Sequence, residues 1–260
     1  MSGTPKTVVL CFHGMGTTKE KGYEEEWMRK VFEYLTDEQR NQVLVHGMTY
    51  AIGVQNNQKE RWEAMRREAS LFYNKWARKF LMYYLSDAAT LEHNSDEPDS
   101  PYRAAQVSIR KELNDLRKRP GVTKDSPIVV LAHSLGCQVF SNFLYDAQNG
   151  KGIFQGNKAS RWEKLEKLRF IYSVGCNIPL FVAGFNEIRP IGETGAAWYN
   201  YHDRRDVLGW PLLPLKEFQG VVTEDRAVWN PTLFESHVTY FENKRIAKDI
   251  AASVAACARS

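Results

Sequence analysis

The chain has 260 residues, of which 43% are hydrophobic and 25% are charged, the ordinary proportions of a globular protein that folds in water. This length suits one domain with one core, so we expect a single domain over residues 1–260. The formal net charge of +4 is too small to indicate nucleic acid as a partner, and none is predicted.

The sequence favours a cytoplasmic protein. No apolar run is long enough to cross a membrane, and the apolar run at residues 7–12 is too short for a secretory signal. The four cysteines show no spacing typical of a zinc site or a disulfide framework, so we interpret them as reduced core residues: Cys11, Cys137, Cys176 and Cys257. No metal and no cofactor are predicted.

The first predicted strand is the apolar run Val8–Phe12, which leads into His13-Gly14-Met15-Gly16. The glycines allow a sharp turn at the end of the strand. In a catalytic interpretation the amide of Met15 donates a hydrogen bond to an oxyanion, with His13 as a support of the turn. The alternative is a plain glycine-rich strand exit.

A predicted helix at residues 23–35 and a predicted strand at 43–50 precede an unusual segment at residues 58–85. Apolar residues recur there every three or four positions, from Trp62 to Tyr83, which indicates one long helix with a continuous apolar stripe. Its other face is basic, with seven Lys or Arg against three Glu between residues 56 and 80. Three roles remain open: a helix that covers the sheet, a lid, or a helix that contacts a membrane surface peripherally.

The centre of the sequence is the segment at residues 127–142. An apolar run, Ile128–Leu131, predicts a buried strand, and apolar residues at helical spacing follow from Leu135. Between them, Ala132-His133-Ser134-Leu135-Gly136 matches the nucleophile elbow G-x-S-x-G, with alanine in place of the first glycine. This turn predicts Ser134 as a nucleophile and the Leu135 amide as an oxyanion donor. The alternative is an ordinary turn of an α/β protein.

The last third continues the alternation of strands and helices. Strands are predicted at residues 168–174 and 197–201, with weaker signals at 221–222 and 227–229, and a helix ends the chain. The sequence therefore predicts an α/β fold with a mostly parallel central sheet of about six strands and helices on both faces. Residues 58–101 are predicted to form a helical insertion ahead of the serine strand.

A serine after a middle strand, an acid after a later strand and a histidine near the end is the chain order of α/β-hydrolase triads. With the turn at 13–16, the elbow at 132–136, the acid loop at 200–207 and Ser236-His237, the sequence resembles the α/β-hydrolase superfamily, specifically its compact lipase- and esterase-like members. The departures are the alanine in the elbow and the position of the insertion at 58–101.

A serine nucleophile needs a neutral imidazole as base and a carboxylate that orients it. His237, after the last strand, is the predicted base, whereas the side chain of His133 leaves the elbow in another direction. Asp206 is the favoured acid because a hydrophobic, proline-containing loop follows it, as it does in lipases. Asp203 is the alternative acid, and Asp225 is a third possibility.

The predicted function is hydrolysis of carboxylic esters of small molecules or lipids through an acyl-enzyme on Ser134. A thioesterase or amidase with the same triad, and a non-catalytic binding module of the same fold, remain as alternatives. Four hydrophobic residues on loops at the catalytic end are predicted to line an acyl pocket, or else to belong to the core: Phe181, Phe185, Trp210 and Leu212.

Overall fold

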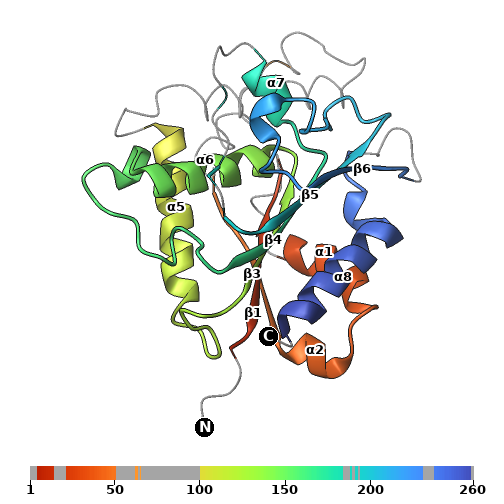
Figure 1. The fold of residues 1–260 in the computed structure, drawn as a ribbon, viewed down its shortest axis with the longest axis horizontal. Helices are drawn as coiled ribbons and strands as arrows, with labels where there is room; N and C mark the ends of the chain where they lie inside the picture. Colours follow the sequence, from red (N-terminus) through yellow and green to blue (C-terminus); the bar gives the residue numbers. More distant parts are fainter. Residues whose placement is uncertain are drawn as a thin grey trace.

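In the computed structural model, the described residues are 5–14, 22–50, 62–63, 65, 100–183, 188, 191–192, 194–230 and 237–258. Within this part of the chain, six strands form one parallel sheet in the order β2-β1-β3-β4-β5-β6 (Figure 1). The strands are β1 (Thr7–Phe12), β2 (Val43–Gly47), β3 (Ile128–His133), β4 (Leu168–Val174), β5 (Ala197–Asp203) and β6 (Glu224–Val228).

Helices cover both faces of this sheet (Figure 1). The longer ones are α1 (Tyr23–Phe32), α5 (Pro101–Leu116), α6 (Leu135–Asn149) and α8 (Lys244–Ala258). Two short helices are α2 (Asp37–Asn41) and α7 (Ile178–Val182), and three 3₁₀ turns are η1 (Gly152–Phe154), η2 (Lys216–Phe218) and η3 (Tyr240–Glu242). The predicted α/β architecture, with about six mostly parallel strands between helices, is confirmed.

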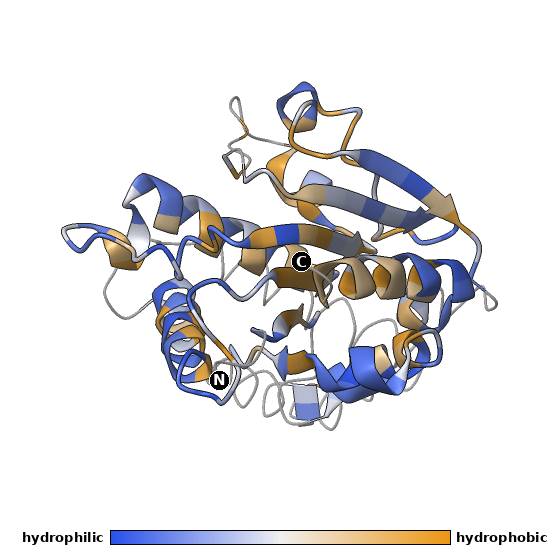
Figure 2. Cartoon of the chain, turned by 60° about the horizontal axis from the view of Figure 1, so that its bottom comes forward, coloured by the Kyte–Doolittle hydropathy of each residue, from blue (hydrophilic) through white to orange (hydrophobic). Residues whose placement is uncertain are grey.

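The alternation of side chains along β1 explains why two separate cores exist. Val8, Leu10 and Phe12 point to the face covered by α5 and α6, whereas Val9 and Cys11 point to the face covered by α1 and α8. A strand buried on both faces has apolar residues at every position, and Figure 2 shows hydrophobic middle strands beside helices of mixed character. This is why the strongest strand signals in the sequence belong to central strands.

The prediction of the last strands had the wrong boundaries. The predicted strands at 221–222 and 227–229 are replaced by one strand, β6, whose first three residues are charged. Because β6 is the edge strand, its side chains are largely accessible to water, and a charged sequence is compatible with a strand there. Val222 instead forms only an isolated bridge with Gln219.

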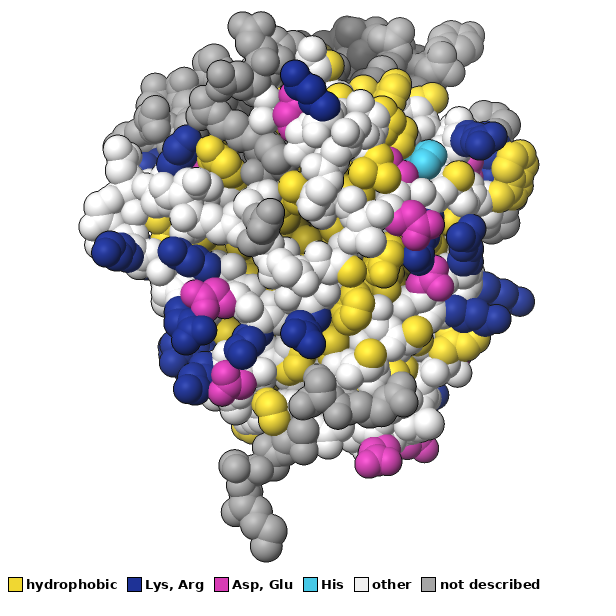
Figure 3. Space-filling view, viewed as in Figure 1, with side chains coloured by type: hydrophobic (Ala, Val, Ile, Leu, Met, Phe, Trp, Pro, Cys, Tyr) yellow, Lys and Arg dark blue, Asp and Glu magenta, His cyan; other side chains and the backbone are white. Residues whose placement is uncertain are grey.

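The positive charge is distributed unevenly. Figure 3 shows lysine and arginine side chains gathered over the C-terminal end of α5 and the segment after it. Exposed members of this group include Arg117, Lys118 and Arg119. They lie at the N-terminal end of β3, opposite the end of the sheet where the elbow follows.

Most of the predicted insertion at residues 58–101 lies outside the described residues. Within residues 58–85, the structure describes Trp62, which is buried, Glu63, and the exposed Met65. The roles of sheet cover, lid or membrane contact therefore stay predictions. Among the described residues, no helix combines the length and the apolar character needed to span a membrane. All four cysteines are buried and free of disulfide bonds.

Candidate active site

The backbone of Ser134 has an uncommon conformation at the junction of β3 and α6. Its φ of 53° and ψ of −125° lie in a region that residues with a side chain rarely adopt. The Ser134 amide donates to the carbonyl of Val174 over 3.1 Å, which ties the turn to the end of β4. A strained residue of this kind is typical of a nucleophile elbow, because the sharp turn lifts the hydroxyl above the sheet.

Two glycines allow the elbow to contact the end of β1 closely. A Cβ at Gly136 would lie 2.2 Å from the carbonyl oxygen of Phe12, and a Cβ at Gly14 would lie 2.9 Å from the Cβ of Ser134. Neither position therefore has room for a side chain. At Gly136 the first turn of α6 therefore packs directly against the backbone of Phe12 and His13, and at Gly14 the turn after β1 packs against the side chain of Ser134.

Ser134, His237 and Asp206 form a continuous hydrogen-bonded chain. The Ser134 hydroxyl lies 2.8 Å from His237 Nε2, and His237 Nδ1 lies 2.8 Å from Asp206 Oδ2. Since an ionised carboxylate only accepts hydrogen bonds, Nδ1 carries the proton, and Nε2 accepts the bond from Ser134. The structure thus brings together the serine, the histidine and the favoured acid from three separate segments.

Asp206 is buried and accepts three hydrogen bonds. Its Oδ2 accepts from His237 and from the hydroxyl of Tyr240 at 2.8 Å, and its Oδ1 accepts from the amide of Leu208 at 3.0 Å. Burial raises the pKa of this carboxyl, but the three hydrogen bonds and the nearby imidazole outweigh burial and hold the pKa below its ordinary value. Asp206 is therefore held as a carboxylate that faces His237.

Asp203, the alternative acid, is bound elsewhere. Both of its carboxylate oxygens accept hydrogen bonds from the Arg205 guanidinium, at 3.0 and 2.8 Å, and one also accepts from the amide of Asn230 at 2.8 Å. Burial raises its pKa, yet the bonds from Arg205 and Asn230 lower it to about 2. The ion pair with Arg205 lies at the end of β5, and the hydrogen bonds that Asp203 and Arg205 form with the backbone of Asn230 connect it to the segment after β6. Among the described contacts there is no hydrogen bond between Asp203 and His237.

Asp225 organises the loop that follows Asp206. Its carboxylate accepts from the side-chain amide of Asn200 at 2.7 Å and from the backbone amides of Leu212 and Leu213. Asn200 also donates to the carbonyl of Trp210. Asp225 therefore holds the proline-containing loop in place from the edge strand.

The sequence did not identify three residues that lie at this site: Tyr240, Gly175 and Gly209. A Cβ at Gly175 would lie 3.2 Å from His237 Nδ1, and a Cβ at Gly209 would lie 2.5 Å from Asp206 Oδ2. Gly175 has a φ of 56° directly after β4. A glycine at the end of a central strand was the available signal, whereas nothing in the sequence marked the hydroxyl of Tyr240.

For the ester hydrolysis that the sequence predicts, Tyr240→Phe is expected to lower kcat about tenfold, because Asp206 would lose one of its three hydrogen bonds. The loss also raises the pKa of Asp206, so the acidic limb of the kcat/KM profile should move to higher pH. Steady-state kinetics across the acidic range would measure both effects. The exposed Tyr34 provides the control, Tyr34→Phe. An unchanged acidic limb in Tyr240→Phe would contradict the assigned contact.

His133 and His13 are packed structural histidines. Nε2 of His133 donates to the carbonyl of His237 at 2.5 Å, and Nδ1 of His13 donates to the carbonyl of Gly14 at 2.5 Å. The ring of His13 stacks on Tyr50, with centroids 4.5 Å apart. Burial lowers the pKa of His133 to about 3, with the nearby His237 as a further cause, and burial lowers the pKa of His13 to about 4.

Stability is therefore expected to fall on mild acidification. A histidine of the unfolded chain takes up a proton near pH 6.5, whereas His133 and His13 stay neutral in the folded protein down to about pH 4. The unfolded state binds more protons in this window, so each histidine lowers the free energy of unfolding by up to about 1.4 kcal/mol per pH unit. Urea unfolding between about pH 7 and about pH 4.5 measures this slope. His133→Gln removes one of the two histidines, so the pH dependence of the free energy of unfolding should become shallower by up to about 1.4 kcal/mol per pH unit. An equal slope in the variant and the native protein would contradict this explanation.

The remaining predicted site residues have different outcomes. Leu135 begins α6 directly after Ser134, so its amide lies at a helix N-terminus, whereas Met15 and Phe185 lie outside the described residues. Trp210 is 42% exposed, and Phe181 is half-buried on α7. Leu212 is completely buried in the core on the α5 and α6 side, so it offers no surface to a substrate in this structure.

Three features of the structure identify the fold: the order of the strands in the sheet, the elbow between β3 and α6, and the order of serine, acid and histidine along the chain. The chain has the α/β-hydrolase fold. No protein-family model matches the sequence, and no curated protein matches it.

Two solved structures are similar to the chain over almost its whole length. One is a dienelactone hydrolase from Anabaena variabilis, with 14% identity, a TM-score of 0.38, and coverage of 98% of this chain and 87% of the other. The second is the esterase domain of a Rhodothermus marinus protein, with 12% identity, a TM-score of 0.37, and coverage of 100% and 88%. At identities this low, any assignment of function rests on the geometry of the site itself.

Proposed function

We propose that the protein is a serine hydrolase that cleaves carboxylic esters through an acyl-enzyme on Ser134. The observation that supports this most directly is the pair of 2.8 Å contacts that connect Ser134 to His237 and His237 to Asp206. A serine hydroxyl in a strained turn, on the nitrogen of an imidazole whose other nitrogen faces a buried carboxylate, is the arrangement that nucleophilic acyl transfer needs.

In the proposed reaction, Ser134 Oγ attacks the ester carbonyl carbon while His237 Nε2 takes the hydroxyl proton. The negative charge that develops on the carbonyl oxygen is stabilised by the amide of Leu135, at the N-terminus of α6, and, as the sequence predicts, by the amide of Met15. His237 then gives the proton to the departing alkoxide. A water molecule, activated by the same imidazole, releases the acid and restores Ser134.

The proposal includes a small-molecule or lipid ester as substrate and a cytoplasmic location. Peripheral membrane contact through the predicted helix at 58–85 is a separate part of the proposal, which depends on the basic character that the sequence predicts for one face of that segment. Of the four predicted pocket residues, Trp210 is exposed and Phe181 is half-buried, so these two have surface that could contact an acyl chain.

A fluorophosphonate probe, which reacts covalently with activated serines, tests the proposal. We expect it to label the native protein on the peptide that contains Ser134 and to leave Ser134→Ala unlabelled. Rates on p-nitrophenyl esters, an acyl-CoA and a p-nitroanilide then separate an esterase from a thioesterase and an amidase. A native protein that is folded and stays unlabelled would contradict the proposal and favour a binding module.

A further inference from the structure

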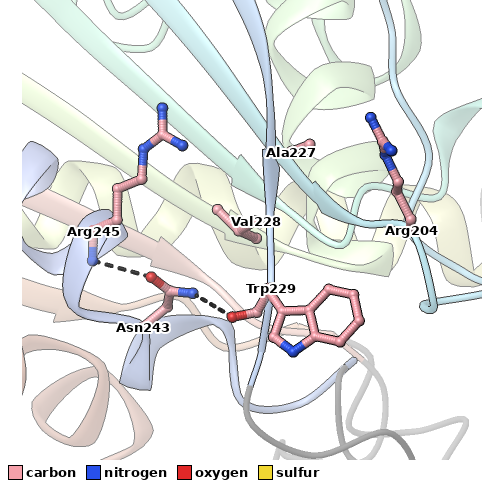
Figure 4. A pocket seen from close by; sticks show the side chains of 6 residues that line it. All are labelled: Arg204, Ala227, Val228, Trp229, Asn243 and Arg245. Atoms are coloured by element: carbon pink, nitrogen blue, oxygen red, sulfur yellow. Dashed lines mark hydrogen bonds between the residues drawn. The ribbon is translucent and has the colours of Figure 1, made fainter.

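A cavity of about 420 Å³ lies at the edge of the sheet, beyond the C-terminal end of β6 (Figure 4). It is lined by Arg204, Ala227, Val228, Trp229, Asn243 and Arg245. Its volume falls within the roughly 300–1,000 Å³ of typical small-molecule sites. None of its lining residues belongs to the chain of contacts from Ser134 to Asp206, so the cavity is distinct from the proposed active site.

Trp229 is 71% exposed, yet several contacts fix it. The Arg205 guanidinium lies 3.6 Å from the centroid of the indole ring, and the side-chain amide of Asn243 donates to the Trp229 carbonyl at 3.3 Å. Arg205 is itself held by the carboxylate of Asp203. An indole exposed to water contributes little hydrophobic stabilisation to the fold. The stability of the fold therefore does not explain why Trp229 is held in place at the surface.

The charge of the cavity is positive. Figure 4 shows Arg204 and Arg245 on opposite sides of the segment that carries Trp229, and no acidic residue lines the cavity. Among the described residues, neither arginine forms an ion pair. The acids of the neighbouring strands are already engaged, since Asp203 pairs with Arg205 and Glu224 pairs with Arg226.

Two features of the cavity therefore select the same kind of ligand. Guanidinium groups match carboxylate and phosphate groups in charge and geometry. The Arg205 guanidinium covers one face of the indole, and the 71% exposure of Trp229 leaves the other face open to a flat apolar body that stacks on it. The side chain of Asn243 already has hydrogen-bond partners within the protein, because its Oδ1 accepts from the amide of Arg245 and its Nδ2 donates to the carbonyl of Trp229.

We propose that this cavity binds a small planar aromatic anion, such as an aryl phosphate or an aryl carboxylate. The ring contacts Trp229, and the anionic group is attracted by Arg204 and Arg245. The site functions independently of Ser134, so it exists whether or not the protein is an esterase.

Isothermal titration calorimetry of the full chain with phenyl phosphate tests this site. We expect saturable binding with a Kd below about 1 mM. Inorganic phosphate lacks the ring and benzyl alcohol lacks the charge, so each should bind at least about tenfold more weakly. Binding of inorganic phosphate as tight as that of phenyl phosphate would overturn the aromatic part of the proposal.

Variants of the lining residues test whether phenyl phosphate binds in this cavity. The double variant Arg204→Gln with Arg245→Gln, and separately Trp229→Leu, should each raise the Kd for phenyl phosphate at least about tenfold. Arg119→Gln, in the basic group at the opposite end of the sheet, removes a positive charge without touching the cavity and should leave the Kd unchanged. Circular dichroism establishes that each variant is folded. A folded double variant with the native Kd, or the absence of saturable binding in the native protein, would overturn the proposal.

Discussion

Ser134→Ala is expected to abolish ester hydrolysis, with a loss in kcat of up to about 10⁶-fold. The hydroxyl that the variant removes is the group that lies 2.8 Å from His237 Nε2, and no other described side chain replaces it there. The rate that remains would come from oxyanion stabilisation and substrate binding alone. Initial rates on a p-nitrophenyl ester, measured against the native protein at equal concentration, give the value.

The fold should survive this change, because alanine removes a single oxygen atom from a turn that backbone contacts hold. Thermal unfolding would therefore differ little between Ser134→Ala and the native protein. Ser141→Ala is a matched control, since Ser141 lies on the same helix, α6, away from the imidazole. Retention of most of the esterase activity in Ser134→Ala would refute the nucleophile assignment, whereas loss in both variants would point to damage to α6.

Asp206→Asn is expected to cost about 10⁴-fold in kcat with little change in structure. The asparagine amide can donate to His237 Nδ1, which favours the tautomer with the proton on Nε2, and that tautomer cannot take the proton of Ser134. The KM for the same ester should change little, because Asp206 is buried behind the imidazole. Kinetics of the purified variant, with circular dichroism as a check of folding, would measure this.

Asp203→Asn is the matched comparison, and its expected effect is on stability. Removing the charge from a completely buried partner of Arg205 should lower the free energy of unfolding by up to about 3 kcal/mol. Its kcat should stay within about tenfold of the native value, since Asp203 contacts Tyr240 only through its backbone amide. If Asp203→Asn lost more activity than Asp206→Asn, the acid would have to be reassigned.

The elbow was predictable because its determinants are local. A buried strand, two small residues and a helix in succession identify Ser134 from neighbours in the sequence, and the structure places that residue at a φ of 53°. Position along the chain was also enough to select His237, since parallel strands bring their C-terminal ends to one edge of the sheet. Its catalytic role, like that of Ser134, stays a prediction until the variants are measured.

The choice between Asp206 and Asp203 was not determined by the sequence. The two carboxylates are only three residues apart, one on the last residue of β5 and one in the loop after it, so neither pattern nor spacing separates them. The structure separates them through partners that are distant in sequence. Arg205 and Asn230 hold Asp203, whereas Tyr240 donates to Asp206, and the absence of a side chain at Gly209 leaves space beside its carboxylate.

The same division applies to the hydrophobic residues and to the edge cavity. The sequence by itself determined which segments are apolar enough to form the central strands, because burial on both faces requires an unbroken apolar run. It did not determine that Leu212 lies in the core while Trp210 and Trp229 are exposed, since equally apolar loop residues differ only in what the folded chain places against them. Those contacts join residues far apart in the sequence, so only the tertiary structure decided them.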